Sequence, residues 1–163
     1  MKKFLKAAAL TTLFIVTSLF VAATIYFNVV TKDITLELEK LSQKPSLTVL
    51  DNDNGIITEG GYVAYDDIPS DLINAFVAVE DKRFFKHKGI DVKRMFGAAI
   101  ANVKNGSVRQ GASTITQQLI KNTHLTSEKS IDRKLKEIKL ALMLERKLSK
   151  EEILERYLNV IYF

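Results

Sequence analysis

The sequence contains no cysteine. Disulfide bonds, a thiol nucleophile and cysteine-bound metals are therefore excluded. Histidine is scarce as well: only His87 and His124 occur, and they do not have the HExxH spacing of a zinc enzyme. The chain also lacks an internal repeat. Its 163 residues and formal net charge of +5 suit one small domain with a tail.

What the sequence does contain is a long apolar segment at its start. Three lysines among the first six residues precede a stretch from Ala7 to Val30 that has no charged residue. About 20 such residues are enough for a helix to cross the hydrocarbon core of a bilayer. We therefore predict that residues 1–32 are a basic cytoplasmic tip and a transmembrane anchor, in a single-pass protein of the cell membrane. Since basic flanks stay inside, the main domain should be extracytoplasmic.

A cleaved signal peptide is the competing interpretation of this segment. The small residues Val21-Ala22-Ala23 resemble a cleavage site. However, the apolar run continues to Val30, beyond the ~7–15 residues of a signal-peptide core. The length of the run favours the uncleaved anchor.

The rest of the chain is expected to be mainly α-helical. Residues 33–66 should form a stem and a small β-hairpin, because β-rich segments flank Asn54-Gly55, a dipeptide suited to tight turns. Residues 67–163 show the apolar spacing of consecutive helices.

Capping residues predict where these helices begin. Pro69 opens the first helix, Asp91 and Ser130 are N-caps, Ser113 begins another helix, and Ser149 starts a capping box with the sequence SKEE. The positions predicted to face the core are Leu72, Phe76 and Val79 after Pro69, Val92, Met95, Phe96, Ala99 and Val103 after Asp91, and Ile131, Leu135, Ile138 and Leu142 after Ser130.

A cluster of charged and aromatic residues, EDKRFFKHKG, follows the first of these helices. Glu80 would lie at the helix C-terminus, where the macrodipole disfavours a negative charge. With Phe84 and Phe85 nearby, this position suits a general acid or base. The alternative is a surface carboxylate paired with Lys82 or Arg83, and the stretch alone leaves both interpretations open.

A second stretch, GSVRQGASTITQQLIKN, has two glycines with the spacing of a phosphate loop. Ala112 stands where that loop requires lysine, so a nucleotide site is excluded. What remains is a loop that runs into a helix N-terminus, which can bind an anion. Its polar candidates are Ser113, Thr114, Gln117, Gln118 and Lys121. A capped helix with a polar outer face is the alternative.

The third stretch is RKLKEIKLALMLERKLSKEEILERYLNVIYF. Arg133 and Glu137 are four residues apart, and Lys134 and Glu137 are three apart, so the three side chains share a helix face. Taken alone, this stretch is typical of an ordinary amphipathic helix.

In this order after an apolar N-terminal segment, the three stretches resemble the bacterial peptidoglycan glycosyltransferases. These are the transglycosylase domains of class A penicillin-binding proteins and their monofunctional relatives. The resemblance covers most of residues 68–163. It implies a lysozyme-like helical fold, of which the C-terminal part would be missing after Phe163. Ile153, Leu158 and Ile161 are then expected to be exposed.

The resemblance also implies a reaction. Glu80 matches the general base that deprotonates the sugar 4-hydroxyl of lipid II, which then attacks the lipid-linked glycan chain and releases polyprenyl pyrophosphate. Glu137 matches a second catalytic glutamate near the pyrophosphate, acting directly or through a divalent cation, Mg or Mn. No organic cofactor is expected. The remaining positions matched to substrate binding are Asp81, Phe84, His87, Ser113, Thr114, Gln117, Gln118, Lys121 and Arg133.

Two other functions compete with a polymerising enzyme. A catalytically inactive remnant would only bind lipid-linked sugar or another cell-wall synthesis protein. A basic protein that binds nucleic acid is disfavoured, because the anchor places the domain outside the cell and no nucleic-acid motif occurs.

Overall fold

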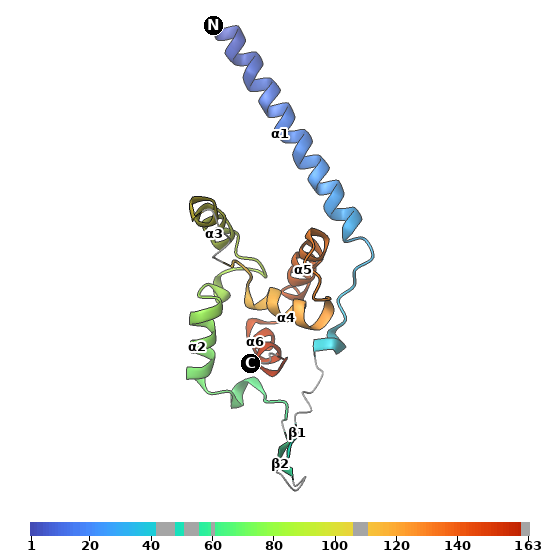
Figure 1. The fold of residues 1–163 in the computed structure, drawn as a ribbon, viewed down its shortest axis with the longest axis vertical. Coiled ribbons are helices and arrows are strands. Elements are labelled where there is room, and N and C mark those ends of the chain that lie inside the picture. The colour runs from blue at the N-terminus through green and yellow to red at the C-terminus, as the bar shows by residue number, and fades with distance from the viewer. Residues whose placement is uncertain (42–47, 51–55, 60, 106–110, 161–163) are drawn as a thin grey trace. The chain divides into compact units, whose positions relative to one another are not determined.

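The structure is a computed structural model that describes residues 1–41, 48–50, 56–59, 61–105 and 111–160. It has two compact units, Met1–Ile34 and Thr35–Phe163. The described part is mainly α, as the sequence predicts (Figure 1). Its α-helices are α1 (Lys2–Val30), α2 (Ser70–Glu80), α3 (Val92–Asn105), α4 (Ile115–His124), α5 (Ile131–Leu144) and α6 (Lys150–Val160), and its 3₁₀ helices are η1 (Leu38–Leu41), η2 (Tyr65–Asp67) and η3 (Phe84–Lys86).

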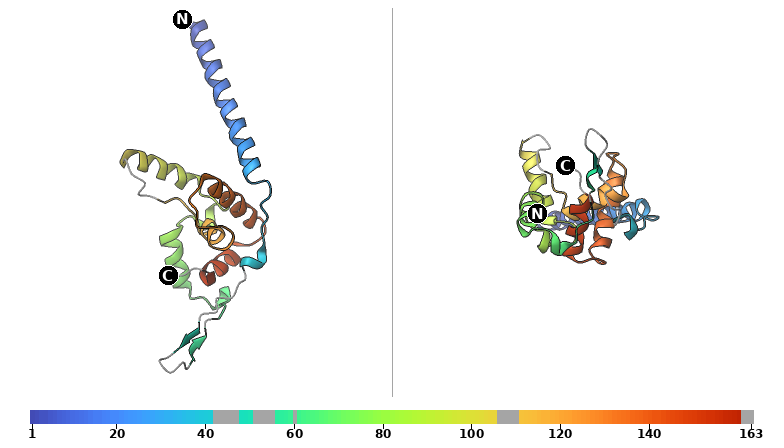
Figure 2. Two further views of the ribbon diagram at one scale, coloured as in Figure 1. Left: turned by 45° about the vertical axis from the view of Figure 1, so that its right-hand side comes forward. Right: turned by 90° about the horizontal axis from the view of Figure 1, so that it is seen from below.

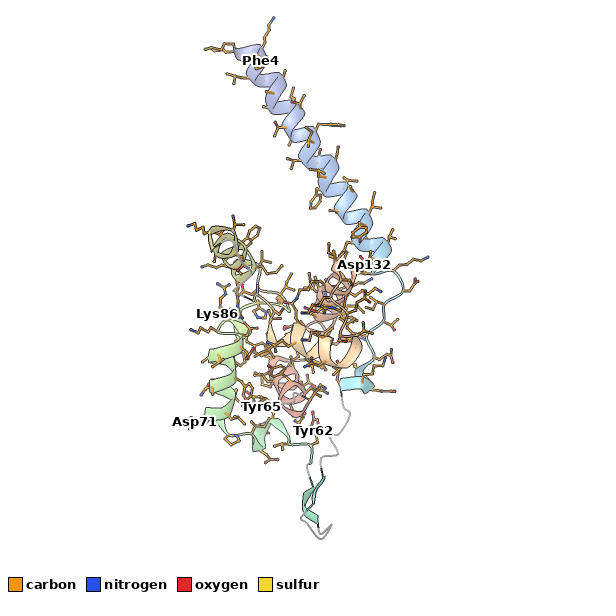
Figure 3. The ribbon with its side chains drawn as sticks, in the orientation of Figure 1. Phe4, Tyr62, Tyr65, Asp71, Lys86 and Asp132 are labelled. Carbon is orange, nitrogen blue, oxygen red and sulfur yellow. The ribbon has the colours of Figure 1, made fainter. Side chains whose placement is uncertain are left out.

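The first unit is the helix α1, whose 29 residues extend over roughly 44 Å at 1.5 Å per residue. Its side chains, such as Phe4, point outward along the whole helix (Figure 3). Thr12 and Thr24 donate their hydroxyls to backbone carbonyls one turn back, at 2.9 Å. Because these polar groups are satisfied within the helix, they do not oppose transfer into lipid. The helix is long and apolar enough to cross a membrane, as anchors and signal sequences are.

In the second unit, η1 is followed by two short strands, β1 (Thr48–Leu50) and β2 (Ile56–Glu59). They pair antiparallel, with Thr48 opposite Glu59. The predicted turn at Asn54-Gly55 lies outside the described residues.

The predicted N-caps are confirmed for three helices. The side chains of Asp91, Ser130 and Ser149 each accept a hydrogen bond from the backbone N–H three residues later, at 3.0–3.1 Å. Glu152 completes the capping box by accepting from the backbone N–H of Ser149 at 2.7 Å.

The other two predicted starts are close to the observed ones. Pro69 is the N-cap residue of α2, which begins at Ser70. The start predicted at Ser113 is wrong by two residues, because α4 begins at Ile115 with Thr114 as its N-cap.

The core of the second unit surrounds α4. This helix packs against α5, α6 and η1, and lies between α5 and α6 in the views (Figures 1 and 2). Among the described residues, the large apolar side chains that are fully buried are Leu41, Phe84, Ile115, Leu119, Ile120, Leu140, Leu144, Ile153, Leu154 and Tyr157. Burial of each such side chain contributes about 1.5–3 kcal/mol, so the helices that meet on α4 hold one another in place.

Polar contacts fasten the chain before α2 to α6. The Tyr62 hydroxyl donates to Glu155 at 2.6 Å, and the Tyr65 backbone N–H donates to the same carboxylate at 2.8 Å. Both tyrosines lie beside α6 (Figure 3). The Asn159 amide pairs in both directions with the Val63 backbone, at 2.8 Å. Burial, reinforced by Glu155, raises the pKa of Tyr62 to about 12, so its hydroxyl remains a donor.

The predicted inward face of α3 is wrong. Val92, Phe96 and Val103 are 50%, 68% and 83% exposed, whereas Ala98 is buried. In α2, Leu72 and Val79 are likewise exposed. Periodicity identifies the apolar face of a helix, but it does not show whether another element covers that face.

The predicted buried stripe of α5 is wrong in a different way. Ile131 is 74% exposed, and the other three predicted positions are only half-buried. The buried residues of α5 are Glu137, Leu140, Ala141 and Leu144. A pattern rule that places carboxylates outward cannot find a buried face that contains Glu137.

The expected exposure at the C-terminal end is also wrong for Ile153, which is fully buried in α6. Leu158 is half-buried, and Ile161 lies outside the described residues. Contact with α4 explains this burial, because α6 presents Ile153, Leu154 and Tyr157 to the core.

Candidate functional site

Glu80 is the last residue of α2, and its side chain is half-buried. Gln118 Nε2 donates to Glu80 Oε2 at 2.9 Å, and Arg94 Nη1 donates to the Glu80 backbone carbonyl at 2.5 Å. Arg83 directs its guanidinium to Asp91, 2.9 Å away, rather than to Glu80. The predicted carboxylate is therefore held by an amide from α4 and not by Arg83.

The residues that follow Glu80 support it from the interior. Asp81 Oδ2 accepts from His87 Nε2 at 2.8 Å and from the Ile115 backbone N–H at 3.1 Å. Both side chains of this pair are almost fully buried. The pair joins the loop after α2 to the first residue of α4.

Phe84 is fully buried beside the same pair. Its ring meets those of Phe85 and His87 edge to face, with centroids 5.2 and 6.1 Å apart. Lys150 Nζ lies 4.2 Å from the Phe84 ring centroid and forms an ion pair with Glu145 at 2.6 Å. These contacts give Phe84 a packing role at the junction of the loop with α5 and α6.

The N-terminus of α4 is closed by its own side chains. Thr114 accepts from the Gln117 backbone N–H at 3.2 Å and donates to the Gly89 carbonyl at 2.6 Å. The Gln117 side chain accepts from the Thr114 backbone N–H, which completes a capping box. Thr114 is fully buried. Ser113, just before the cap, is half-buried and accepts from Lys134 Nζ at 3.0 Å.

Glu137 is enclosed by three nitrogen donors. Arg133 Nη1 lies 2.7 Å from Oε2, Gln117 Nε2 lies 3.0 Å from Oε1, and Lys134 Nζ also contacts Oε1. The Glu137 side chain is 2% exposed, whereas those of Arg133 and Lys134 are 18% and 37% exposed. The carboxylate thus anchors two cations that extend toward solvent, which stabilises a charge that is otherwise costly to bury.

Both glutamates are held from α4 by neighbouring residues. Gln117 donates to Glu137, and Gln118 donates to Glu80. One turn of helix therefore connects the end of α2 with the middle of α5. The partly exposed carboxylate of Glu80 and the partly exposed cations of Arg133 and Lys134 therefore lie around the same helix, α4.

The structure sorts the candidate residues into two groups. Those with partly or fully exposed side chains are Glu80, Ser113, Gln118, Lys121 and Arg133. Those in the interior are Asp81, Phe84, His87, Thr114, Gln117 and Glu137. The interior group orients and supports the site, and only the first group can touch a ligand in this conformation.

A basic hollow of about 500 Å³ opens next to the end of α2. Its lining residues are Val79, Lys82, Arg83, Asp91, Arg94, Ala98 and Gly111. Three of them are cationic, and one of these, Arg83, is balanced by Asp91. Residues on both sides of Glu80 line the hollow, while the Glu80 carboxylate is turned to Gln118.

The residues around Glu137 do not fit a resident divalent cation. Mg²⁺ and Mn²⁺ need several oxygen ligands, but Glu137 is surrounded by nitrogen donors, two of them charged. Across the described ranges, no three histidine, aspartate or glutamate side chains gather into a metal site.

Sequence reasoning missed two residues that contact the Glu80 end of the site. Arg94 holds the Glu80 carbonyl, and the Tyr157 hydroxyl donates to Gln118 Oε1 at 3.2 Å. Tyr157 gives a signal in retrospect: it continues the buried stripe of Ile153 and Leu154, where a hydroxyl needs a partner. Arg94 gives none, since one arginine on an exposed helix has no distinguishing pattern.

Comparison with known proteins identifies relatives of this chain. A family model described as Transglycosylase matches residues 54–163. Penicillin-binding protein 1A of Clostridium perfringens (strain 13 / Type A) is 56% identical over 114 residues, which are 67% of this chain and 17% of that protein. Penicillin-binding protein 1A/1B of Bacillus subtilis (strain 168) is 44% identical over 149 residues, which are 88% of this chain and 16% of that protein. The chain thus spans about a sixth of the length of these relatives.

Proposed function

Because this chain belongs to the transglycosylase family, that of the transglycosylase domain in class A penicillin-binding proteins, we propose that it is part of a peptidoglycan glycosyltransferase. Its substrates are lipid II and a lipid-linked glycan chain, and its product is a β-1,4-linked glycan. Residues 67–163 carry the catalytic part, with a lysozyme-like fold.

The observation that carries this proposal is the placement of Glu80 and of the Glu137 cations around one helix. Glu80 is half-buried, and the side-chain donor that the structure gives its carboxylate is the neutral amide of Gln118. Arg133 and Lys134 are oriented by a buried carboxylate and partly exposed. A glycosyl transfer from a diphosphate needs both features: a base for the incoming hydroxyl and positive charge for the leaving diphosphate.

In this mechanism Glu80 accepts the proton of the sugar 4-hydroxyl of lipid II. The hydroxyl oxygen attacks the anomeric carbon of the glycan chain, the bond from that carbon to the diphosphate breaks, and the configuration inverts. Arg133 and Lys134 bind the diphosphate oxygens as negative charge develops there. Ser113 lies against Lys134 and adds a hydroxyl donor on the same side.

Glu137 acts in this mechanism by holding the cations, and Gln117 holds Glu137. Its burial keeps it from direct contact with the substrate. The resemblance leads us to expect that Glu137 acts near the pyrophosphate. In this proposal Arg133 and Lys134 contact the pyrophosphate, and Glu137 orients them.

The helix α1 supplies the location that such a reaction needs. Both substrates are held in the bilayer by polyprenyl chains, so the enzyme must work at the lipid surface. We assign α1 as an uncleaved anchor with its lysine-rich end in the cytoplasm, which places residues 33–163 outside.

The proposal is tested by adding labelled lipid II to the chain in lipid vesicles and separating the glycan products. Glu80→Gln keeps the size and hydrogen bonding of the side chain but not its basicity, and it should lower turnover ~10²-fold or more. Lys82→Ala, which changes an exposed neighbouring charge, should have a much smaller effect. Binding of lipid II without any glycan would instead support an inactive lipid-binding remnant, and parental turnover by Glu80→Gln would reject the base assignment.

A further inference from the structure

We infer that Gln118 and Tyr157 are positioning residues that form a hydrogen-bonded relay to Glu80 and orient its carboxylate for proton transfer. The inference rests on the proposed function in one respect, namely that Glu80 is the base. The relay joins three helices: Tyr157 from α6, Gln118 from α4 and Glu80 from α2. The hydrogen bonds are 3.2 Å from Tyr157 to Gln118 and 2.9 Å from Gln118 to Glu80.

The direction of the relay follows from donor chemistry. An ionised carboxylate only accepts hydrogen bonds, so Gln118 must present its NH₂ group to Glu80 Oε2. The amide oxygen then faces α6, where only a donor can satisfy it. The Tyr157 hydroxyl is that donor, and it prevents the amide from turning its oxygen toward the carboxylate.

Tyr157 is held rigidly enough for this task. Its side chain is 1% exposed, and its ring meets that of Phe76 from α2 edge to face, with centroids 6.2 Å apart. Burial, followed by the negative charges of Glu80 and Asp81, raises the pKa of Tyr157 to about 12. The hydroxyl therefore remains protonated, and remains a donor, throughout the pH range in which the enzyme can work.

The relay fixes the part of Glu80 that the backbone leaves free. Arg94 fastens the Glu80 carbonyl, but the side chain of a residue at a helix end can still rotate. Gln118 engages Oε2, so Oε1 is the oxygen that we assign to the incoming hydroxyl. A base held in a single orientation needs no reorganisation as the proton moves.

Several other ionisable groups lie near this end of α2. They are Asp81 with His87 in the following loop, Lys82 and Arg83 beside them, and Arg94 on α3. Variants of Gln118 and Tyr157 change none of these charges. A change in the titration of Glu80 can therefore be attributed to the relay.

The test compares Tyr157→Phe and Gln118→Leu with the unchanged chain. Phenylalanine keeps the ring contact with Phe76 and removes only the hydroxyl. Loss of a donor to a carboxylate favours its protonated form, so the acidic limb of the rate–pH profile should move to higher pH in both variants. Turnover above that limb should fall about 2–10-fold, as the loss of one net hydrogen bond predicts. Tyr62→Phe, which removes a hydroxyl bonded to Glu155 elsewhere on α6, should leave the profile unchanged.

The double variant Gln118→Leu with Tyr157→Phe separates a relay from two independent effects. Because Tyr157 acts through Gln118, the double variant should equal Gln118→Leu alone. Additive effects would overturn the relay.

A measurement without substrate decides the relay even if the chain makes no glycan. The carboxyl ¹³C resonance of Glu80, followed in detergent micelles, should titrate at higher pH in both single variants. If the unchanged chain is inactive but this shift appears, the relay stands and the proposed activity of the chain fails. If Tyr157→Phe leaves the titration of Glu80 unchanged, the relay is wrong whatever the activity.

Discussion

Glu137 is the residue at which charge and burial are most tightly connected. A carboxylate that is 2% exposed is stable only because Gln117, Arg133 and Lys134 direct donors at it. When one partner of such a group is removed, the others are left without compensation.

We therefore expect Glu137→Gln to lower both stability and activity. It should reduce the free energy of unfolding by roughly 1–3 kcal/mol, because the two cations lose their counter-charge. It should lower turnover of lipid II at least tenfold, because Arg133 and Lys134 are no longer oriented. Denaturant unfolding and glycan assays measure the two effects, with Glu128→Gln in the exposed connection after α4 as the control. Recovery of turnover on adding Mg²⁺ would contradict the anchoring role.

Gly89 is a residue whose small size is required. Its φ is +87°, and a Cβ there would lie 2.8 Å from the Ala141 carbonyl oxygen on α5. Gly89→Ala should therefore destabilise the fold by at least about 1–2 kcal/mol from backbone conformation alone, with the clash added.

The matched control for Gly89 is Gly97 in α3, where nothing lies within 4 Å of a new Cβ. Gly97→Ala should stabilise the fold by about 0.5–1 kcal/mol, because alanine is the better helix former. Thermal unfolding of both variants compares them directly. Equal effects of the two substitutions would show that the close approach of Gly89 to Ala141 is unimportant.

At the scale of the elements, capping residues could be predicted reliably from the local sequence, whereas the burial of helix faces could not. Asp91, Ser130 and Ser149 could be predicted as caps because each satisfies donors within its own helix turn. The environment of Phe96 could not be predicted, because it depends on whether a distant segment covers α3.

The candidate site shows the same division. Glu80 and Glu137 could be selected from motifs, since the stretches that contain them resemble those of a family over many residues. The interior position of Asp81 and His87 could not be predicted, because ionisable side chains in a polar stretch of sequence are usually solvated, and nothing in the sequence indicates that these two pair with each other. Tyr157 was missed because its partner lies 39 residues away on α4.

A pH-sensitive contact joins Glu37, the residue before η1, to His124, the last residue of α4. His124 Nε2 contacts the Glu37 backbone, and burial lowers the pKa of His124 below its usual 6.5. His124 therefore binds a proton less readily in the folded state than in the unfolded state. The contribution of neutral, buried His124 to stability is present above pH 6.5 and is lost as the pH falls through the lowered pKa of His124 in the folded state.

We expect acidification below pH 6.5 to lower the unfolding temperature, in part through His124. His124→Gln should remove that part of the pH dependence, since glutamine does not titrate. The difference between the two melting curves at each pH isolates the histidine from other groups. Parallel curves for the two proteins would show that His124 does not contribute.

At the scale of the whole molecule, the chain combines one long apolar helix with a helical unit of the transglycosylase family. The orientation of that helix decides whether the second unit lies outside the cytoplasm, where the proposed reaction requires it. Three lysines among the first six residues favour a cytoplasmic N-terminus.

We therefore expect a reporter that works only outside the cytoplasm to be active when fused after residue 163. The fusion should also sediment with membranes. Replacing Lys2, Lys3 and Lys6 with glutamine should reduce the fraction with this orientation. Reporter activity inside the cytoplasm would reverse the topology, and release of a soluble fragment would indicate a cleaved signal sequence.

The adjacent positions of Gln117 and Gln118 have a consequence for inhibition. Neighbouring residues on a helix project about 100° apart, so the two amides reach different partners, yet a displacement of the helix backbone shifts both of them. A compound that displaces α4 while it binds at the cations of Glu137 must also disturb the amide that holds Glu80. The ¹³C resonance of Glu80 would then report binding at the other end of the site, and compounds could be ranked by how strongly they disturb Glu80 without touching it.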